Sequence, residues 1–209
     1  MLHAANSIAR PDRSTLGSIG VRLLLRLSRA IDALNERVGH LVYWLILAAV
    51  LVSAGNATVR YLFDMSSNGW LELQWYLFAA VFLLASGYTL RHNEHVRIDV
   101  IISHLPPRLR AWIDLLGGLL FLLPMATIIL VLSWPMFIES VVRNEFSADA
   151  GGLLRWPAKL LIPVGFLLLA LQGVSEIIKR AAFLLGRIPD PLEMHREPMA
   201  EEFLKGAVE

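Results

Sequence analysis

Residues 41–63 read LVYWLILAAVLVSAGNATVRYLF, and this stretch decides the fold. It is 23 residues long, and its single Lys, Arg, Asp or Glu residue is Arg60, close to its end. At a rise of about 1.5 Å per residue, a helix of this length crosses a hydrocarbon core of about 30 Å. Three further runs of 22 to 25 residues are similarly apolar along their middle, at 70–91, 111–135 and 158–180. The sequence therefore predicts an all-α integral membrane protein with four transmembrane helices.

The composition supports this class and excludes several kinds of site. Hydrophobic residues make up 56% of the 209 residues, and the mean hydropathy is +0.57. A soluble domain of this size could not bury so much apolar surface. The chain has no cysteine, which excludes disulfides, thiol nucleophiles, iron–sulfur clusters and cysteine-ligated zinc. The first run is too long for the apolar region of a signal peptide, so we expect it to stay in the mature protein.

Basic residues outside the spans predict the orientation. They gather in segment 1–40, in the loop between the second and third spans, and towards the C-terminus. The first loop has none, and the third loop mixes Arg143 and Arg155 with acidic residues. Because positively charged loops stay in the cytoplasm, both termini are predicted to be cytoplasmic. We expect a cytoplasmic arm (1–40), a four-helix membrane domain (41–180) and a cytoplasmic tail (181–209).

The N-terminal arm has the pattern of an amphipathic helix. Seven apolar residues recur at spacings of three and four on one face: Leu16, Ile19, Leu23, Leu27, Ile31, Leu34 and Val38. Four arginines fall elsewhere around the same helix: Arg22, Arg26, Arg29 and Arg37. This pattern is typical of a helix in the headgroup region of a membrane. A surface anchor and a docking face for a second membrane subunit are both compatible with it.

The second loop contains NEHVRIDVIISHLPP at residues 93–107. Asn93 is a favourable N-cap, and the proline pair ends whatever precedes it. In a short helix on the cytoplasmic side, His95 and Asp99 would lie four residues apart on one face, within hydrogen-bonding reach. The apolar alternation would also suit a strand, but a lone strand at a membrane leaves its backbone groups unpaired. We therefore expect a short helix here.

Polar and small residues mark candidate contacts of the first two spans. Ala49, Ser53 and Ala57 recur every four residues and form a ridge that another helix can approach closely. Asn56 and Arg60 continue a polar edge towards the outer surface, where the second span begins with Trp70, Glu72 and Trp75. Arg60 and Glu72 could form an ion pair. Alternatively, Arg60 extends to lipid phosphates and Glu72 is solvated. The two tryptophans suit the aromatic belt of a membrane interface.

The spans contain no visible means of moving a solute or of catalysis. No Asp, Glu, Lys or Arg lies near the middle of any span, although ion and proton pathways need such groups. His40 and His92 could ligate a haem, as in the membrane anchors of redox complexes. His92, His95 and Asp99 could form a metal site. Interfacial histidines are common without any ligand, however, and no catalytic motif is present, so we expect neither an enzyme nor a cofactor.

Two segments resemble a known family. Residues 70–82, WLELQWYLFAAVF, are similar to the second span of the small permease subunit of the tripartite ATP-independent periplasmic (TRAP) transporters. Residues 87–100, GYTLRHNEHVRIDV, resemble the junction between spans two and three of that family. The resemblance extends over about residues 24–184, and Trp70, Glu72 and the stretch from His95 to Asp99 are its most specific parts.

This resemblance implies a division of labour within the bacterial inner membrane. In the family, a large membrane subunit holds the substrate and sodium sites, and a periplasmic binding protein delivers the substrate, an organic carboxylate. The small subunit is a scaffold for the large one, in contact with membrane lipids and with no nucleic-acid partner. Two alternatives stay open at this stage: a haem-bearing or quinone-facing anchor of a redox complex, and an assembly or signalling protein.

Overall fold

The computed structural model describes residues 13–64, 67–92 and 105–189. Within these ranges the chain is helical: α1 (Arg13–Phe63), α2 (Asn68–Arg91), α4 (Pro107–Gly117), the π-helical turn η1 (Gly118–Leu122), α5 (Leu123–Val142) and α6 (Trp156–Leu184). The β-structure in these ranges is one isolated bridge between Phe146 and Leu154. The prediction of an all-α protein is confirmed. The predicted short helix with His95 and Asp99 lies in 93–104, outside the described residues.

Four helical stretches are long and apolar enough to cross a membrane: Gly20–Phe63, Asn68–Arg91, Pro107–Val142 and Trp156–Leu184. The prediction of four spans is therefore supported. Each helix extends past its apolar run, because charged residues continue a helix beyond the hydrocarbon region as readily as apolar ones. Proline at the first positions of α4 and α6 favours these starts.

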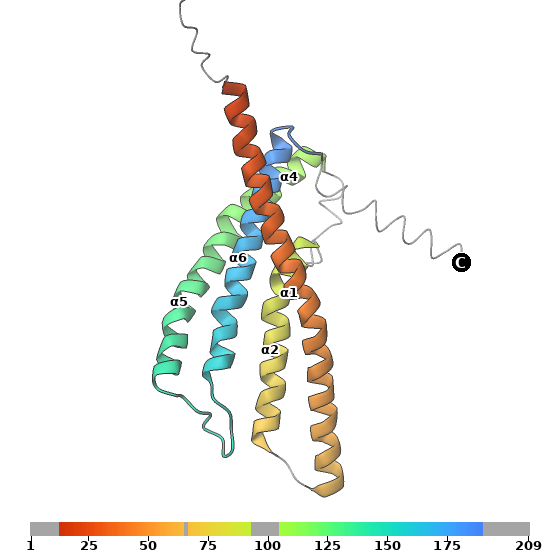
Figure 1. Cartoon of the computed structure of the whole chain (residues 1–209), viewed down its shortest axis with the longest axis vertical. Coiled ribbons are helices and arrows are strands. Elements are labelled where there is room, and N and C mark those ends of the chain that lie inside the picture. Colours follow the sequence, from red (N-terminus) through yellow and green to blue (C-terminus); the bar gives the residue numbers. More distant parts are fainter. Residues whose placement is uncertain (1–12, 65–66, 93–104, 190–209) are drawn as a thin grey trace, which may run out of the picture.

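The arm and the first span are one helix, which differs from the expected pair of separate elements. α1 runs for 51 residues without interruption, and Figure 1 shows it projecting beyond the other helices at its N-terminal end. No proline lies within it to break the hydrogen-bond ladder. At the expected boundary, Nδ1 of His40 lies 2.8 Å from the carbonyl oxygen of Glu36, one turn earlier. A location of residues 16–38 in the headgroup region stays a prediction.

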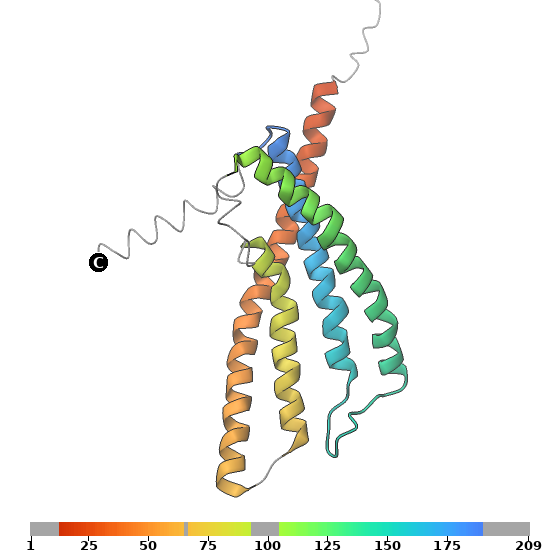
Figure 2. The same cartoon turned by 180° about the vertical axis from the view of Figure 1, so that it is seen from behind.

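The spans are arranged in the order α1, α2, α6, α5 (Figures 1 and 2). α2 packs between α1 and α6, and α5 packs on the other side of α6. Near its N-terminal third α1 also crosses α6 directly, whereas towards the opposite end the two helices diverge on either side of α2. We call the end with this crossing the basic end, and the end with loops 64–67 and 143–155 the loop end.

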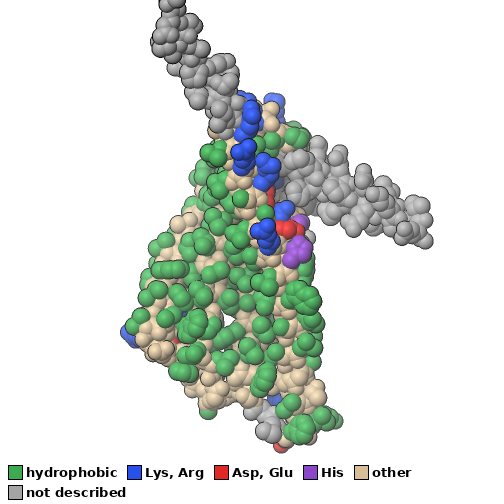
Figure 3. All heavy atoms as spheres, in the orientation of Figure 1, with side chains coloured by type: hydrophobic (Ala, Val, Ile, Leu, Met, Phe, Trp, Pro, Cys, Tyr) green, Lys and Arg blue, Asp and Glu red, His purple; other side chains and the backbone are tan. Residues whose placement is uncertain are grey.

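Small residues allow the helices to approach each other. A β-carbon at Gly87 would stand 2.1 Å from Oδ1 of Asn35 on α1, and one at Gly165 would stand 2.8 Å from Cβ of Leu83 on α2. Large apolar side chains are instead exposed along α1, α2 and α5. Figure 3 shows hydrophobic side chains over most of one face, with Lys and Arg over the upper part of α1. Close packing of small residues inside and apolar side chains outside suits a protein surrounded by lipid.

Candidate functional site

Polar side chains gather where α1 crosses α6. We call this group the basic-end cluster; its members are Ser28, Asp32, Asn35, Gln172, Ser175, Glu176 and Lys179. Ser28 and Asp32 lie on the same side of α1 as Asn35, because the spacings of four and three bring residues to one helix face. The members on α6 follow the same periodicity. The cluster therefore forms where two polar helix stripes meet.

Asp32 is the centre of the basic-end cluster. Its Oδ1 accepts hydrogen bonds from Oγ of Ser175 at 2.7 Å and from Nε2 of Gln172 at 2.9 Å. Nζ of Lys179 lies 3.3 Å from Oδ2, and Lys179 also pairs with Glu176. Oγ atoms of Ser28 and Ser175 are 2.7 Å apart. A carboxylate with several donors is stabilised in this partly buried place, so α1 is held on α6 in one register.

Asn35 extends the cluster towards α2. Its Nδ2 donates to Oε1 of Gln172 at 3.0 Å, and both residues are fully buried. The side chain lies directly against Gly87 of α2. Three helices thus meet around one amide pair.

Charged residues at the basic end also form contacts between the other helices. Arg91 at the end of α2 binds the Glu36 carboxylate and donates to the carbonyl oxygen of Asp32 at 2.8 Å. On the far side of α6, Arg180 lies 3.3 Å from Asp114 of α4. The basic end is therefore cross-linked across α1, α2, α4 and α6.

His40 and His92 both lie near the Glu36 carboxylate. Nδ1 of His92 is 3.1 Å from the carbonyl oxygen of Tyr88, and Nε2 is 3.7 Å from Oε2 of Glu36. The two nitrogens of this imidazole thus face oxygens of the chain. Among the described residues, no three His, Asp or Glu side chains are grouped as metal ligands would be.

A second group of contacts lies at the loop end, and Glu72 is its centre. Oε2 of Glu72 accepts a hydrogen bond from the backbone N–H of Leu153 at 2.6 Å, and Oε1 accepts one from the Ser147 hydroxyl. Tyr76 donates to the carbonyl oxygen of Leu154 at 3.2 Å. We call Glu72, Tyr76, Ser147 and Leu153 the loop-end cluster. It attaches α2 to the loop between α5 and α6.

Arg60 does not contribute to this cluster, and no Arg60–Glu72 ion pair occurs in the described part of the chain. Neither sequence alternative anticipated the partners of Glu72, because a carboxylate near a span terminus does not reveal loop residues 75 and 81 positions away. Arg60 instead lines a hollow of about 540 Å³ with Asp64 and Gln74.

Glu145 connects the third loop to the start of α6. Its carboxylate binds Nζ of Lys159, and Arg155 lies 3.5 Å from its Oε1. The hydrogen bond from Lys159, with the positive charges of Lys159 and Arg155, holds the pKa of the Glu145 carboxyl below its ordinary value. The loop between α5 and α6 is thus tied to both α2 and α6.

The polar contacts at the basic end and those at the loop end form two levels, which are separated by about the thickness of a hydrocarbon core. On α6, Lys159 and Glu176 are 17 residues apart, which at about 1.5 Å per residue corresponds to about 26 Å. On α2, Glu72 and Arg91 are 19 residues apart, which corresponds to about 29 Å. Neither helix has a charged residue between these positions. The polar contacts therefore lie near the two membrane surfaces.

The predicted small-residue ridge is used partly within the chain. Ala49 is buried, whereas Ser53 is half-buried and Ala57 is exposed. Ser53 and Ala57 line the same hollow as Arg60, opposite Leu71 and Gln74 of α2. Close approach of α1 and α2 thus occurs at Ala49 and is lost towards the loop end.

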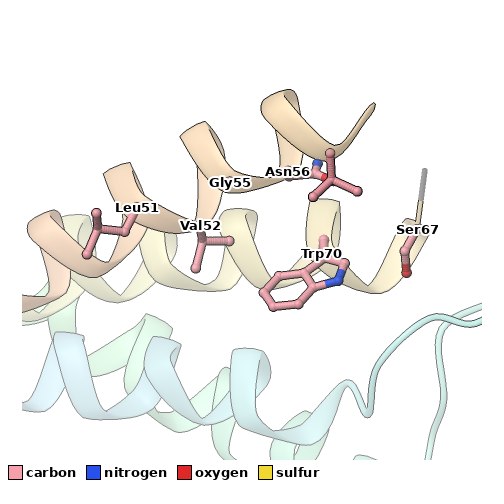
Figure 4. Close-up of a pocket in the computed structure, with 7 residues that line it drawn as sticks. Leu51, Val52, Gly55, Asn56, Ser67 and Trp70 are labelled. Carbon is pink, nitrogen blue, oxygen red and sulfur yellow. The ribbon is translucent and has the colours of Figure 1, made fainter. Parts of the chain in front are cut away.

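A second hollow, of about 440 Å³, lies between α1 and α2 near the loop end (Figure 4). Leu51, Val52, Gly55 and Asn56 of α1 line it, together with the indole of Trp70 from α2. Trp70 and Trp75 are both more than half exposed, as expected for residues of an interfacial belt. Whether the candidate contact residues touch a partner stays a prediction.

The sequence analysis missed Asp32, Glu36, Ser175 and Lys179. A signal for them existed, since Ser28, Asp32, Asn35 and Glu36 recur at spacings of three and four beside the apolar stripe. The same spacing joins Gln172, Ser175, Glu176 and Lys179. A polar stripe on two helices indicates a contact between them inside a membrane protein.

Comparison with known proteins gives one match. A family model described as "Tripartite ATP-independent periplasmic transporters, DctQ component" matches residues 49–183. Searches of curated proteins and of solved structures gave no match. The matched range contains all of α2, α4, α5 and most of α6.

Proposed function

The chain belongs to the DctQ component family of the tripartite ATP-independent periplasmic transporters and is a small membrane subunit of such a transporter; we propose that it acts there as a rigid scaffold for the large membrane subunit. The family is one of transporter components rather than enzymes. The proposed partners are the large subunit, a periplasmic binding protein and the surrounding lipids.

One observation supports the proposal: the two helical hairpins are linked at both the basic end and the loop end. Gln172 and Lys179 attach α6 to α1 at the basic end, and Glu72 attaches α2 to the loop between α5 and α6 at the loop end. Buried hydrogen-bonded groups resist relative movement of the helices, because separating them would leave polar groups without partners. Such rigidity suits a static support.

Substrate movement is assigned to the large subunit. The middle of α2 and of α6 holds no charged side chain between the two polar levels, whereas coupling sodium to a carboxylate requires groups that bind both. We therefore assign sodium-coupled uptake of an organic carboxylate to the complex, with the substrate delivered by the binding protein. The resemblance of residues 70–100 supports this assignment.

We further propose that the protein lies in the bacterial inner membrane with its basic end in the cytoplasm. The basic end carries Arg22, Arg26, Arg29, Arg37, Arg91, Arg108 and Arg110, and positively charged segments stay on that side. Because the chain has no cysteine, a single Ala150→Cys substitution should be labelled in intact cells by a maleimide that reaches only the periplasm. An Arg187→Cys variant should be labelled only after the cells are opened.

Reconstitution tests the scaffold function. The large subunit and binding protein would be placed in proteoliposomes with and without this chain, and sodium-driven uptake of the substrate would be measured. We expect uptake only with all three proteins and no carboxylate binding by this chain alone. Full uptake without the chain, or tight carboxylate binding by the isolated chain, would contradict the proposal.

A further inference from the structure

One side of α1 carries an unbroken ladder of apolar residues at spacings that follow the helical period. Its larger members are Leu23, Leu27, Leu34, Leu41, Val52 and Val59. The positions between them are also apolar or glycine: Ala30, Val38, Leu45, Ala48 and Gly55. Spacings of three and four over 36 residues keep all eleven positions on one side of the helix.

This ladder is not the side that packs inside the chain. The side of α1 that contacts α2 and α6 includes Ser28, Asn35 and Ala49, which are buried. Leu23 and Leu27 of the ladder are 66% and 51% exposed, and Leu41 is 56% exposed. The chain therefore covers the polar stripe of α1 and leaves seven of the eleven ladder positions exposed. The other four, Val38, Leu45, Ala48 and Val52, are half-buried.

The ladder is longer than lipid tails can cover. From Leu23 to Val59 it extends about 54 Å along a continuous helix, whereas the hydrocarbon core is about 30 Å thick. Asp32 and Glu36 lie at the level of the basic-end cluster. Leu23 and Leu27, the first members of the ladder, precede them on α1 and lie beyond this level. Because α1 runs on from the span without a break (Figure 1), these leucines project past that level rather than turning aside. A protein surface can cover both parts of the ladder.

The lower part of the ladder leads into the hollow of Figure 4. Val52, Gly55 and Val59 line it beside Trp70. A β-carbon at Gly55 would meet nothing within 4 Å, whereas at Gly39, Gly87, Gly165 and Gly173 it would stand less than 3 Å from a neighbouring residue of the chain. Gly55 therefore costs helix propensity without an internal contact, and its open place can receive a side chain from another helix.

The charged residues beside the ladder indicate which charge the partner surface should carry. Arg22, Arg26, Arg29 and Arg37 are exposed on the adjoining side of the same helix. Figure 3 shows Lys and Arg gathered over this part of α1. A complementary surface is apolar where it meets the leucines and acidic beside them.

We propose that the ladder from Leu23 to Val59 is the surface that binds the large membrane subunit. A transmembrane helix of that subunit packs along Leu41–Val59 and places a side chain in the hollow at Gly55. Beyond the membrane, an apolar surface with acidic neighbours covers Leu23 and Leu27. This inference rests on the proposed function, since it names the contact surface for the same partner.

Cross-linking in the native complex tests the surface. The chain has no cysteine, so single cysteines carrying a short photoactivatable maleimide report one position each. Val52→Cys has a control of the same residue type in Val50→Cys, which lies at a similar depth on the opposite side of α1. Leu27→Cys has a control in Ala33→Cys, an exposed position on the arginine side.

We expect cross-links to the large subunit at positions 27 and 52, with severalfold lower yields at positions 33 and 50. Equal yields, higher yields at the controls, or cross-links to lipid alone at position 27 would overturn the inference while leaving the proposed function intact. Failure of the unmodified chain to co-purify with the large subunit would instead overturn the proposed function.

A larger side chain at position 55 tests whether the hollow receives a side chain of the large subunit. Gly55→Leu should leave the isolated chain folded, because a β-carbon there meets nothing within 4 Å and the position borders a hollow of about 440 Å³. In the complex it should lower the amount of co-purified large subunit about tenfold, as expected when a well-packed contact is overfilled. Gly117→Leu is the control, since a β-carbon there also meets nothing within 4 Å and α4 lies outside the proposed surface. Equal effects of the two substitutions would contradict the assignment.

Discussion

Glycines in the membrane helices have opposite surroundings at two positions. Gly87 lies against the buried Asn35 amide, and a β-carbon at Gly87 would stand 3.2 Å from the carbonyl oxygen of Leu168. Gly55 borders an open hollow. Both residues occur within apolar runs, and nothing in the local sequence shows that one is packed and the other open. Only the position of neighbouring helices gives the two glycines different consequences.

We expect Gly87→Ala to destabilise the isolated chain by about 2 kcal/mol, because its β-carbon would overlap Asn35 and force α1 away. Gly55→Ala should be neutral or stabilise the chain by up to about 1 kcal/mol through helix propensity. Unfolding by sodium dodecyl sulfate in mixed micelles measures both. A similar loss for the two variants would show that α1 and α2 are not packed as described.

Glu145 gives a pH-dependent contact at the residue scale. Because Lys159 lowers the pKa of its carboxyl, the contact stabilises the folded chain above the ordinary pKa of glutamate and is lost as the pH falls through the lower, folded-state pKa. Lys159→Met should raise the pKa of Glu145 towards its ordinary value, as followed by carbon-13 NMR of the carboxyl. Arg143→Met, which removes the exposed partner of Glu139, should leave the Glu145 titration unchanged. An unaltered midpoint in Lys159→Met would exclude the pairing.

At the element scale, the crossing of α1 over α6 depends on polar contacts. The sequence analysis assigned the apolar stripe of the arm to the membrane surface or to a second subunit and named no partner for the arm inside the chain. Ser28, Asp32 and Asn35 are the residues that meet α6. Inside a bilayer, apolar side chains gain little by meeting one another instead of lipid, whereas polar groups need partners. The polar stripe therefore packs inwards.

A double-mutant cycle on Asp32 and Lys179 measures this contact. Lys179→Met leaves a partly buried carboxylate without its ion-pair partner, so we expect a loss of about 2 kcal/mol, with a similar loss for Asp32→Ala. The double variant should lose less than the sum of the two, with a coupling of about 1–3 kcal/mol. Strictly additive losses in the micelle unfolding assay would show that the two side chains do not interact in the folded chain.

At the scale of the whole molecule, two hairpins are joined by contacts far apart in sequence. Asn35 and Gln172 are separated by 137 positions, and Glu72 and Leu153 by 81. The first contact lies at the basic end and the second at the loop end. We therefore expect assembly to depend little on the connection between α2 and α4.

We expect separately expressed pieces 1–98 and 99–209 to associate in the membrane and co-purify. Combining Gln172→Leu with Glu72→Gln should reduce this association severalfold, because one contact is lost at each surface. Arg143→Met is the control, since its ion pair with Glu139 lies within the second piece. Undiminished association of the doubly substituted pieces would assign the assembly to apolar packing alone.

The number of spans, their approximate ends and the all-α class follow from the sequence by itself, because hydropathy and helix length are local properties that the bilayer thickness selects. The family also follows from local strings around Trp70 and His92, and the family match confirms it. The tertiary structure alone decided that the arm continues into the first span, that Glu72 binds Ser147 and Leu153 rather than Arg60, and that Asp32 and Lys179 meet. It also decided which side of α1 stays open. Such pairings depend on where helices and loops meet, and those meeting points are set by packing between residues 75 to 147 positions apart, which no local pattern encodes.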